Sequence, residues 1–179
     1  QCEDWTLCEE IVGMKVDGRW SASIGVGVMQ THFRAFSFGG GVQSVAVMVL
    51  QAQGAISEPF DAFVFANVGH DSENPATLDY IGEIVKPYMA AHGMTFVECQ
   101  KTRFGKPETL YQSVIRDNRS IPIPVHMPGG SKSKRACTTS FKVEVVDKWI
   151  KSQHSGEHVE IGIGFSVDEM RRLDGREQG

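Results

Sequence analysis

The chain has 179 residues and a mass of 19.7 kDa, which is the usual length of about one domain. Hydrophobic residues make up 41% of the sequence, charged residues make up 22%, and the formal net charge is −4. These values exclude a disordered tail, a collagen-like repeat and a coiled coil, and the net charge does not favour a duplex DNA binder. The sequence therefore predicts one globular domain.

Cysteine usage and hydropathy predict a cytoplasmic protein with no membrane partner. No stretch is apolar and long enough to span a membrane, and no signal-peptide pattern is visible. The four cysteines include no CxxC pair, which favours reduced thiols over a disulfide framework or a self-contained metal site. The chain starts at Gln1 and stops abruptly at Gly179, so truncation at the C-terminus stays open.

Residues 1–32 predict an irregular leader, because glycines interrupt any long periodic pattern there, although residues 9–16 could form a short strand or helix. The domain is then expected to span residues 33–179. It opens with an aromatic strand over residues 33–38, followed by Gly39-Gly40-Gly41. The apolar run over residues 42–53 predicts a buried helix, which Gly54 ends as a C-cap.

Residues 60–66 form a nearly continuous apolar run, which is typical of a parallel strand. A polar loop over residues 67–74 follows, and Asn74 and Pro75 predict the start of a helix that reaches about residue 92. Pro87 is expected to bend or divide this helix. One apolar face is predicted from Leu78, Ile81, Ile84 and Val85.

The remaining elements follow the same alternation. Residues 94–99 predict a third strand, residues 106–116 a short helix, and the proline- and glycine-rich residues 121–134 a long loop. Thr138 or Thr139 is expected to cap a helix over residues 140–152, and residues 158–165 predict a fourth strand. The side chains expected to face inward from that helix are Phe141, Val143, Val146 and either Trp149 or Ile150.

Strands that alternate with helices predict an α/β fold with a doubly wound, mostly parallel sheet and helices on both faces. Ligands of such sheets bind at the carboxyl ends of the strands, near a switch in strand order. Residues 39–44, 67–74 and 164–172 are expected to lie at that edge.

The glycine loop after the first predicted strand carries the strongest chemical signal. Glycines permit close approach, and a helix N-terminus offers free N–H groups and a positive dipole end to an anion, to which Ser44 could add a hydroxyl donor. No Gly-Lys-Ser/Thr of a Walker A loop follows, and no G-x-G-x-x-G is present. The pattern favours a phosphate or sulfate site, and the alternative is a glycine-rich turn without a ligand.

Residues 36–44, Phe-Ser-Phe-Gly-Gly-Gly-Val-Gln-Ser, resemble the PP-loop of the adenine nucleotide alpha-hydrolase superfamily. The Ser-Phe-Gly…Gln version is similar to the phosphoadenylyl-sulfate (PAPS) reductase branch and its phage-type members. Residues 65–77 resemble that branch's Asp-Thr-Gly…Pro-Glu-Thr segment. Residues 135–142 are similar to its Arg-x-Cys-Thr-x-x-Phe-Lys element, and residues 162–172 to Gly-Ile-x-x-Asp-Glu-x-x-Arg.

The chain also departs from this family in two ways. Gln43 stands where the usual loop has an Asp that is associated with metal-dependent pyrophosphate chemistry. The redox cysteine that true PAPS reductases carry in a C-terminal tail has no counterpart before Gly179. The family resemblance therefore implies a nucleotide-binding core that lacks part of the redox apparatus.

The resemblance implies a bound adenine nucleotide (ATP, AMP or PAPS), with the need for magnesium left open, and an iron–sulfur cluster only if further cysteines come from outside this chain. No metal ligands are assigned. Catalytic roles fall on Cys137, Arg135 and Lys142. The implied nucleotide-binding residues are Ser37, Gly39, Gly40, Gly41, Gln43, Ser44, Asn67, Val68, Gly69, His70, Asp71, Asp168 and Arg172.

Several of these residues have an equally plain structural interpretation. His70 and Asp71 could form a solvated turn, and Cys137 could be a buried structural cysteine rather than a thiolate or ligand. Two basic groups, around Lys101 and around Lys132, could bind phosphosulfate or a nucleic acid backbone, or could lie in solvated loops.

Three functions are therefore carried forward. The first is an enzyme that resembles PAPS reductase and acts at an α-phosphate or on an adenylyl-sulfate. The second is an ATP-dependent component of nucleic-acid sulfur or base modification. The third is a degenerate, non-catalytic nucleotide-binding subunit. The expected partners are a small nucleotide, a thioredoxin-like reductant or a nucleic acid, and a homo-oligomeric state stays open.

Overall fold

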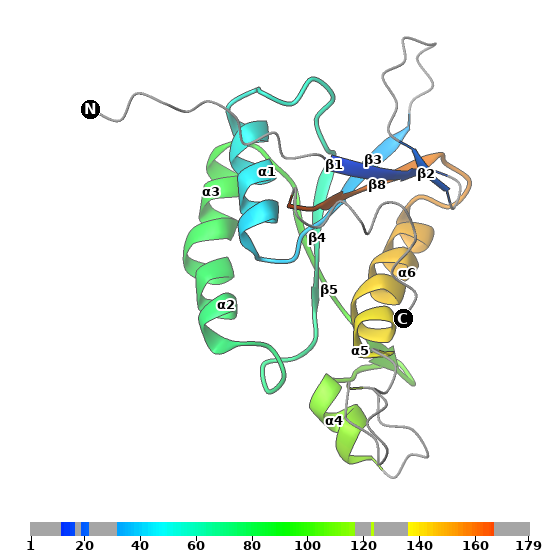
Figure 1. Cartoon of the computed structure of the whole chain (residues 1–179). Helices are drawn as coiled ribbons and strands as arrows, with labels where there is room; N and C mark the ends of the chain where they lie inside the picture. The colour runs from blue at the N-terminus through cyan, green and yellow to red at the C-terminus, as the bar shows by residue number, and fades with distance from the viewer. Residues whose placement is uncertain (1–11, 17–18, 22–31, 117–122, 124–135, 167–179) are drawn as a thin grey trace, which may run out of the picture.

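The computed structural model describes residues 12–16, 19–21, 32–116, 123 and 136–166, and these form an α/β fold. Its main sheet has six strands in the order β2-β1-β8-β3-β4-β5. Helices cover both faces of this sheet (Figure 1). The predicted fold class, a doubly wound and mostly parallel sheet, is confirmed.

The parallel part of the sheet consists of β3 (Phe33–Ser37), β4 (Ala62–Asn67), β5 (Phe96–Gln100) and β8 (Val159–Gly164). β3 lies between β4 and β8 and runs parallel to both. The chain therefore moves from β3 outward to β4 and β5, and then returns to the opposite side of β3 with β8. This reversal creates a topological switch point between β3 and β8.

The expected irregular leader is wrong where the structure describes it. β1 (Val12–Val16) and β2 (Arg19–Ser21) pair as an antiparallel hairpin, and β1 pairs with β8 in register Gly13↔Ile163. A strand over residues 9–16 was one of the open alternatives, but the sheet pairing was missed because these short strands depend on a ladder with β8, which lies far away in sequence. Their own glycine-interrupted pattern carries no trace of that partner.

One face of the sheet packs against α1 (Val42–Ala52) and against the continuous helix formed by α2 (Pro75–Tyr80), η1 (Ile81–Val85) and α3 (Lys86–Ala91). Aromatic side chains from β3 and β4 fill this interface, with Phe36, Phe63 and Phe65 almost fully buried. Gly54 lies directly after the C-cap of α1, and Ala55 N–H bonds to Leu50 O, as expected of a glycine C-cap.

The predicted division at Pro87 takes the form of a π-helical turn. Proline has no N–H, so the regular ladder fails one turn before it. η1 supplies i→i+5 bonds, including Lys86 N–H to Ile81 O, and the helix continues into α3. Ile81 and Val85 are buried, but Ile84 is 52% exposed, so its predicted place on the inner face is wrong.

The other face packs against α5 (Ala136–Thr138), η2 (Thr139–Val143) and α6 (Glu144–Gln153). The helix begins before Thr138 and Thr139, so neither residue is its cap. Phe141, Val146 and Ile150 are buried as predicted, and Val145 is buried beside them. Val143, expected to face inward, is 48% exposed, because residues two positions apart on a helix lie about 200° apart around its axis and Val143 therefore points away from the side of Phe141.

Beyond β5, the chain forms a small hairpin and a short helix. β6 (Thr102–Arg103) and β7 (Lys106–Pro107) pair antiparallel, and α4 (Leu110–Ile115) follows behind a Thr109–Gln112 capping box. The helix predicted over residues 106–116 is thus confirmed only in its second half. Among the described residues, no helix has the length and apolar character needed to cross a membrane.

Candidate functional site at the carboxyl edge of the sheet

The glycine loop leaves β3 at the switch point, as its position between strand and helix predicts. Phe38 N–H still bonds to Val64 O of β4, so the loop proper consists of residues 39–41. Gly39 is exposed, and a Cβ there would have open space around it. Gly40 has φ +73°, and a Cβ there would lie 3.1 Å from Cγ2 of Thr77, so the loop passes close to α2. Both the positive φ and the close contact with Thr77 favour glycine at this position.

The first turn of α1 is open to a ligand. Gly41 is its N-cap, and among the described residues no side chain caps the helix, so the first backbone N–H groups have no partner within the helix. Ser44 is buried, and its hydroxyl donates to Gly41 O at 2.9 Å. The Ser44 proton is therefore engaged, and the backbone amides are the donors that an anion would meet. Val42, which sequence reasoning passed over, places an exposed side chain at this turn.

Gln43 connects this turn to β8. A Cβ placed on Gly164 would lie 3.0 Å from Cβ of Gln43 and 3.5 Å from the ring of Phe36. The last residue of β8 is thus a glycine because the first turn of α1 passes directly over it. Residues 39–44 and the end of β8, two of the predicted segments, are brought together. Ser37 ends β3 beside Ile163 of β8.

The loop after β4 is held by α4 rather than left open. Val68 O accepts from Leu110 N–H, and Asn67 Oδ1 accepts from Gly69 N–H at 2.8 Å. Gly69 has φ +114°, and a Cβ on it would lie 2.5 Å from Thr109, so only glycine fits beneath the start of α4. Two backbone groups of the implied nucleotide-binding residues, Val68 O and Gly69 N–H, therefore already have partners within the chain.

Asp71 is the carboxylate that joins this loop to α4. Thr109 Oγ1 donates to its Oδ2 at 2.9 Å and Ser72 Oγ donates to its Oδ1 at 2.8 Å. Partial desolvation opposes ionisation, but these hydrogen bonds outweigh it and hold the pKa of Asp71 below its ordinary value. Asp71 thus stays ionised and positions the loop, while its neighbour His70 is exposed.

Lys142, in η2, contacts the loop after β4 from the face of the sheet opposite to α1. Its Nζ lies 3.6 Å from Oε2 of Glu73, an oxygen that is buried and has no hydrogen-bond partner among the described residues. Lys142 is 45% exposed, so it can still turn toward an added anion. Cys137 lies at the start of the same helix, in α5, and is half-buried. Glu73 was not singled out from sequence, since nothing local marks its partner.

Three residues implied by the resemblance, Arg135, Asp168 and Arg172, lie outside the described residues, as does most of the long loop predicted over residues 121–134. Among the described residues, no group of three or more His, Cys, Asp or Glu side chains is arranged to hold a metal ion. Magnesium usually enters such sites with the phosphates it coordinates, held by one or two carboxylates. Asp71 and Glu73 are the carboxylates of the loop after β4, and both already have contacts within the chain.

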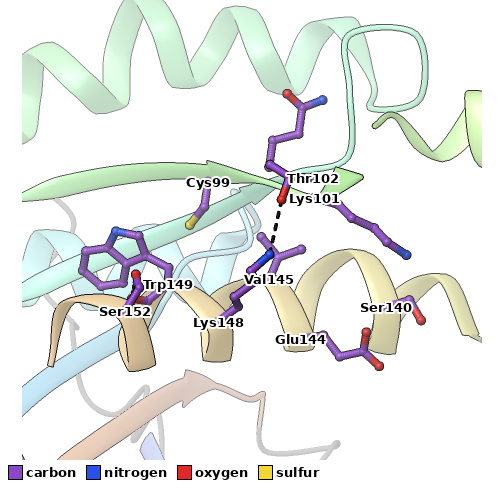
Figure 2. Close-up of a pocket in the computed structure, with 10 residues that line it drawn as sticks. Cys99, Lys101, Thr102, Ser140, Glu144, Val145, Lys148, Trp149 and Ser152 are labelled. Atoms are coloured by element: carbon purple, nitrogen blue, oxygen red, sulfur yellow. Dashed lines mark hydrogen bonds between the residues drawn. The ribbon is translucent and has the colours of Figure 1, made fainter. Parts of the chain in front are cut away.

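A separate groove of about 380 Å³ lies between β5 and α6 (Figure 2). Lys148 from α6 donates to Thr102 Oγ1 across it at 3.3 Å, and Trp149 and Cys99 line its apolar part. Burial, and secondarily the charge of Glu98, raises the pKa of the Cys99 thiol to about 11. Lys101, from one of the two basic groups, lines this groove, but none of the nucleotide-binding residues implied by the resemblance does. Cys99 is a packing residue, as its strand position predicts.

No protein-family model, curated protein or solved structure matches this chain. The resemblance to PP-loop proteins therefore rests on the four sequence segments alone.

Proposed function

We propose that this chain binds an adenine nucleotide at the carboxyl edge of its parallel sheet. The phosphates would lie on residues 39–41 and on the first amides of α1. The observation that carries this proposal is the uncapped N-terminus of α1, which follows an exposed glycine loop at the switch point between β3 and β8. Doubly wound sheets bind ligands at such points, and helix N-termini bind phosphate.

The resemblance of residues 36–44 to the PP-loop supports an adenine nucleotide over other phosphates. It also supports a reaction at the α-phosphate or on an adenylyl-sulfate, with Lys142 as the cation that neutralises charge on the leaving group. The ion pair of Lys142 with Glu73 would keep this cation beside the loop after β4 until a nucleotide arrives. A role for Cys137, a thioredoxin-like reductant and a cytoplasmic location belong to the same proposal.

Calorimetry with ATP, AMP, adenylyl sulfate and PAPS, each with and without magnesium, tests the proposal. Gly39→Asp is the informative variant, because a side chain has open space there and a carboxylate would face the anion site. It is expected to weaken binding at least about fivefold, from roughly 1 kcal/mol of repulsion at close range. The fold should keep its stability, because a negative charge near a helix N-terminus is favourable.

Ser57→Asp is the matched control. It adds the same charge at an exposed position before β4, on the opposite edge of the sheet, and is expected to bind like the unaltered chain. If none of the four nucleotides binds, the proposal fails. If Gly39→Asp binds as well as the control, the glycine loop is not the phosphate site. Binding without turnover would identify a non-catalytic subunit.

A further inference from the structure

The turn of the β6–β7 hairpin exposes an aromatic ring at a cost to the fold. Phe104 and Gly105 are its two central residues, with φ +50° and +77°. Two-residue turns of this kind favour Asn-Gly or Gly-Gly, because positive φ is costly for a side-chain-bearing residue and most of all for a bulky one. Phe104 is nevertheless 91% exposed. An exposed ring in strained backbone suggests a use outside the fold itself.

The ring lies at the rim of a groove of about 460 Å³ between the hairpin and α4. The guanidinium carbon of Arg103 lies 5.0 Å from the centroid of Phe104, so the cation already lies against the ring. Ile115, which is 61% exposed, provides apolar surface on the α4 side of the groove. The groove thus presents a flat aromatic face with a cation beside it.

Positive charge collects around this groove although the chain as a whole carries a net charge of −4. Arg103 and Arg116 line it, and Lys106 lies directly across the hairpin from Arg103. Glu108 pairs with both arginines, to Arg103 at 3.9 Å, and so offsets one of these charges. Among the described residues, no carboxylate lies within ion-pair distance of Lys106. The surface is therefore suited to a polyanion that also offers flat apolar groups.

We propose that the β6–β7 hairpin and α4 form a docking surface for single-stranded nucleic acid. An unpaired base would stack on Phe104, and the adjoining phosphates would meet Arg103 and Lys106. Stacking on exposed aromatic rings between basic side chains is how single strands are bound without sequence preference. A duplex keeps its base faces covered, so it would gain only the phosphate contacts. Neither contact involves the sugar, so DNA and RNA strands should bind alike.

The hairpin begins directly after β5, at the carboxyl edge of the sheet on which the glycine loop also lies (Figure 1). A strand held there would lie along the same edge as the proposed nucleotide site. The docking surface does not depend on nucleotide binding, because it shares no residue with residues 39–44. Gly39→Asp should therefore leave it intact, which separates the failure of one proposal from the failure of the other.

Fluorescence anisotropy with labelled oligothymidylate, oligouridylate and a duplex of equal length tests the proposal. Phe104→Gly is the decisive variant, because it removes the ring and relieves the positive φ at once. It is expected to weaken single-strand binding roughly 5- to 150-fold, the usual range for one stacked base. The same variant should melt at or above the temperature of the unaltered chain. Loss of binding then cannot be ascribed to misfolding.

Lys106→Gln tests the phosphate contact separately. It should weaken binding and reduce the slope of log K against log salt by about 0.7, the value for one phosphate of a single strand. Ile84→Ala and Lys151→Gln are matched controls, since Ile84 is exposed on η1 and Lys151 is exposed in the last turn of α6, beyond the Lys148 that bonds to Thr102. Neither change should alter binding.

Three results would overturn the proposal. The first is a single strand bound no more tightly than the duplex, and the second is unaltered binding by both Phe104→Gly and Lys106→Gln. The third is an absence of oligonucleotide binding altogether. If Phe104→Gly instead abolished a self-association seen by sedimentation, the ring would serve a protein contact and not a nucleic acid.

Discussion

Gly69→Ala offers a sharp test of how the loop after β4 is held. The added Cβ would lie 2.5 Å from both Cβ and Cγ2 of Thr109 and 2.9 Å from Oδ1 of Asp71. The φ of +114° is also unfavourable for alanine. Positive φ costs about 1–2 kcal/mol and overpacking about 1–3 kcal/mol, so the free energy of unfolding should fall by about 2–5 kcal/mol.

Gly82→Ala is the matched control for this change. Gly82 lies in η1, and a Cβ there would meet nothing within 4 Å. The same chemical substitution should therefore stabilise the helix by up to about 1 kcal/mol. For a chain of this size each kcal/mol shifts the melting temperature by about 2–4 °C. Gly69→Ala should then melt about 4–20 °C lower and Gly82→Ala slightly higher.

Calorimetric melting of the two variants measures the difference, and hydrogen exchange locates it. Because Thr109 caps α4 and bonds to Asp71, displacing it should speed exchange of the α4 amides first. A Gly69→Ala chain that melts at or above the unaltered temperature would refute the close packing of Thr109 on Gly69. If the α4 amides exchange at the same rate in Gly69→Ala as in the unaltered chain, the loop changes conformation without disturbing the helix.

Three further outcomes are expected. Val145→Ala should lower the free energy of unfolding in urea by about 2 kcal/mol, whereas Val143→Ala, at a 48% exposed residue, should lower it by under about 1 kcal/mol. Equal losses would contradict the inward position of Val145. Burial raises the pKa of the Cys99 thiol to about 11, so Cys99 should react slowly with an alkylating reagent at neutral pH. The free energy of unfolding that the protonated thiol contributes below pH 9.0 should be lost as the pH rises toward 11. The hydrogen bond from Lys86 holds the pKa of Glu98 below 4.5, so the stability that this pair contributes should be present above pH 4.5 and lost as the pH falls below it. Lys86→Met should raise the pKa of Glu98 in an NMR titration. An unchanged pKa would show that Lys86 is not the cause of the shift.

The elements that could be predicted are those whose signal is local. A few neighbouring residues are enough to predict three of these features. They are the apolar strand β4, the helix start at Asn74-Pro75 and the glycine that ends α1. The capping box of Thr109 and Gln112 was also readable, as a Thr-x-x-Gln pattern, and would have placed the start of α4 correctly.

The errors occurred where the cause lies elsewhere in the chain or where apolar character outweighed helical spacing. β1 and β2 exist because β8 offers them an edge, and a strand as short as β2 has no pattern of its own. Ile84 and Val143 were assigned inward because they are apolar. At about 100° per residue, Ile84 lies about 100° around the helix from the buried Val85, and Val143 lies about 200° from the buried Phe141, so both side chains leave the inner face.

The sequence by itself determined the fold class of this protein: an α/β fold with a glycine loop between a buried strand and a partly buried helix. These features follow from local chain stiffness and from the spacing of apolar residues. Tertiary structure alone decided what the site residues do. It fastened the loop after β4 to α4 through Asp71, and it brought Lys142 to Glu73. These partners lie on elements that meet only when the sheet forms, and no local pattern encodes them.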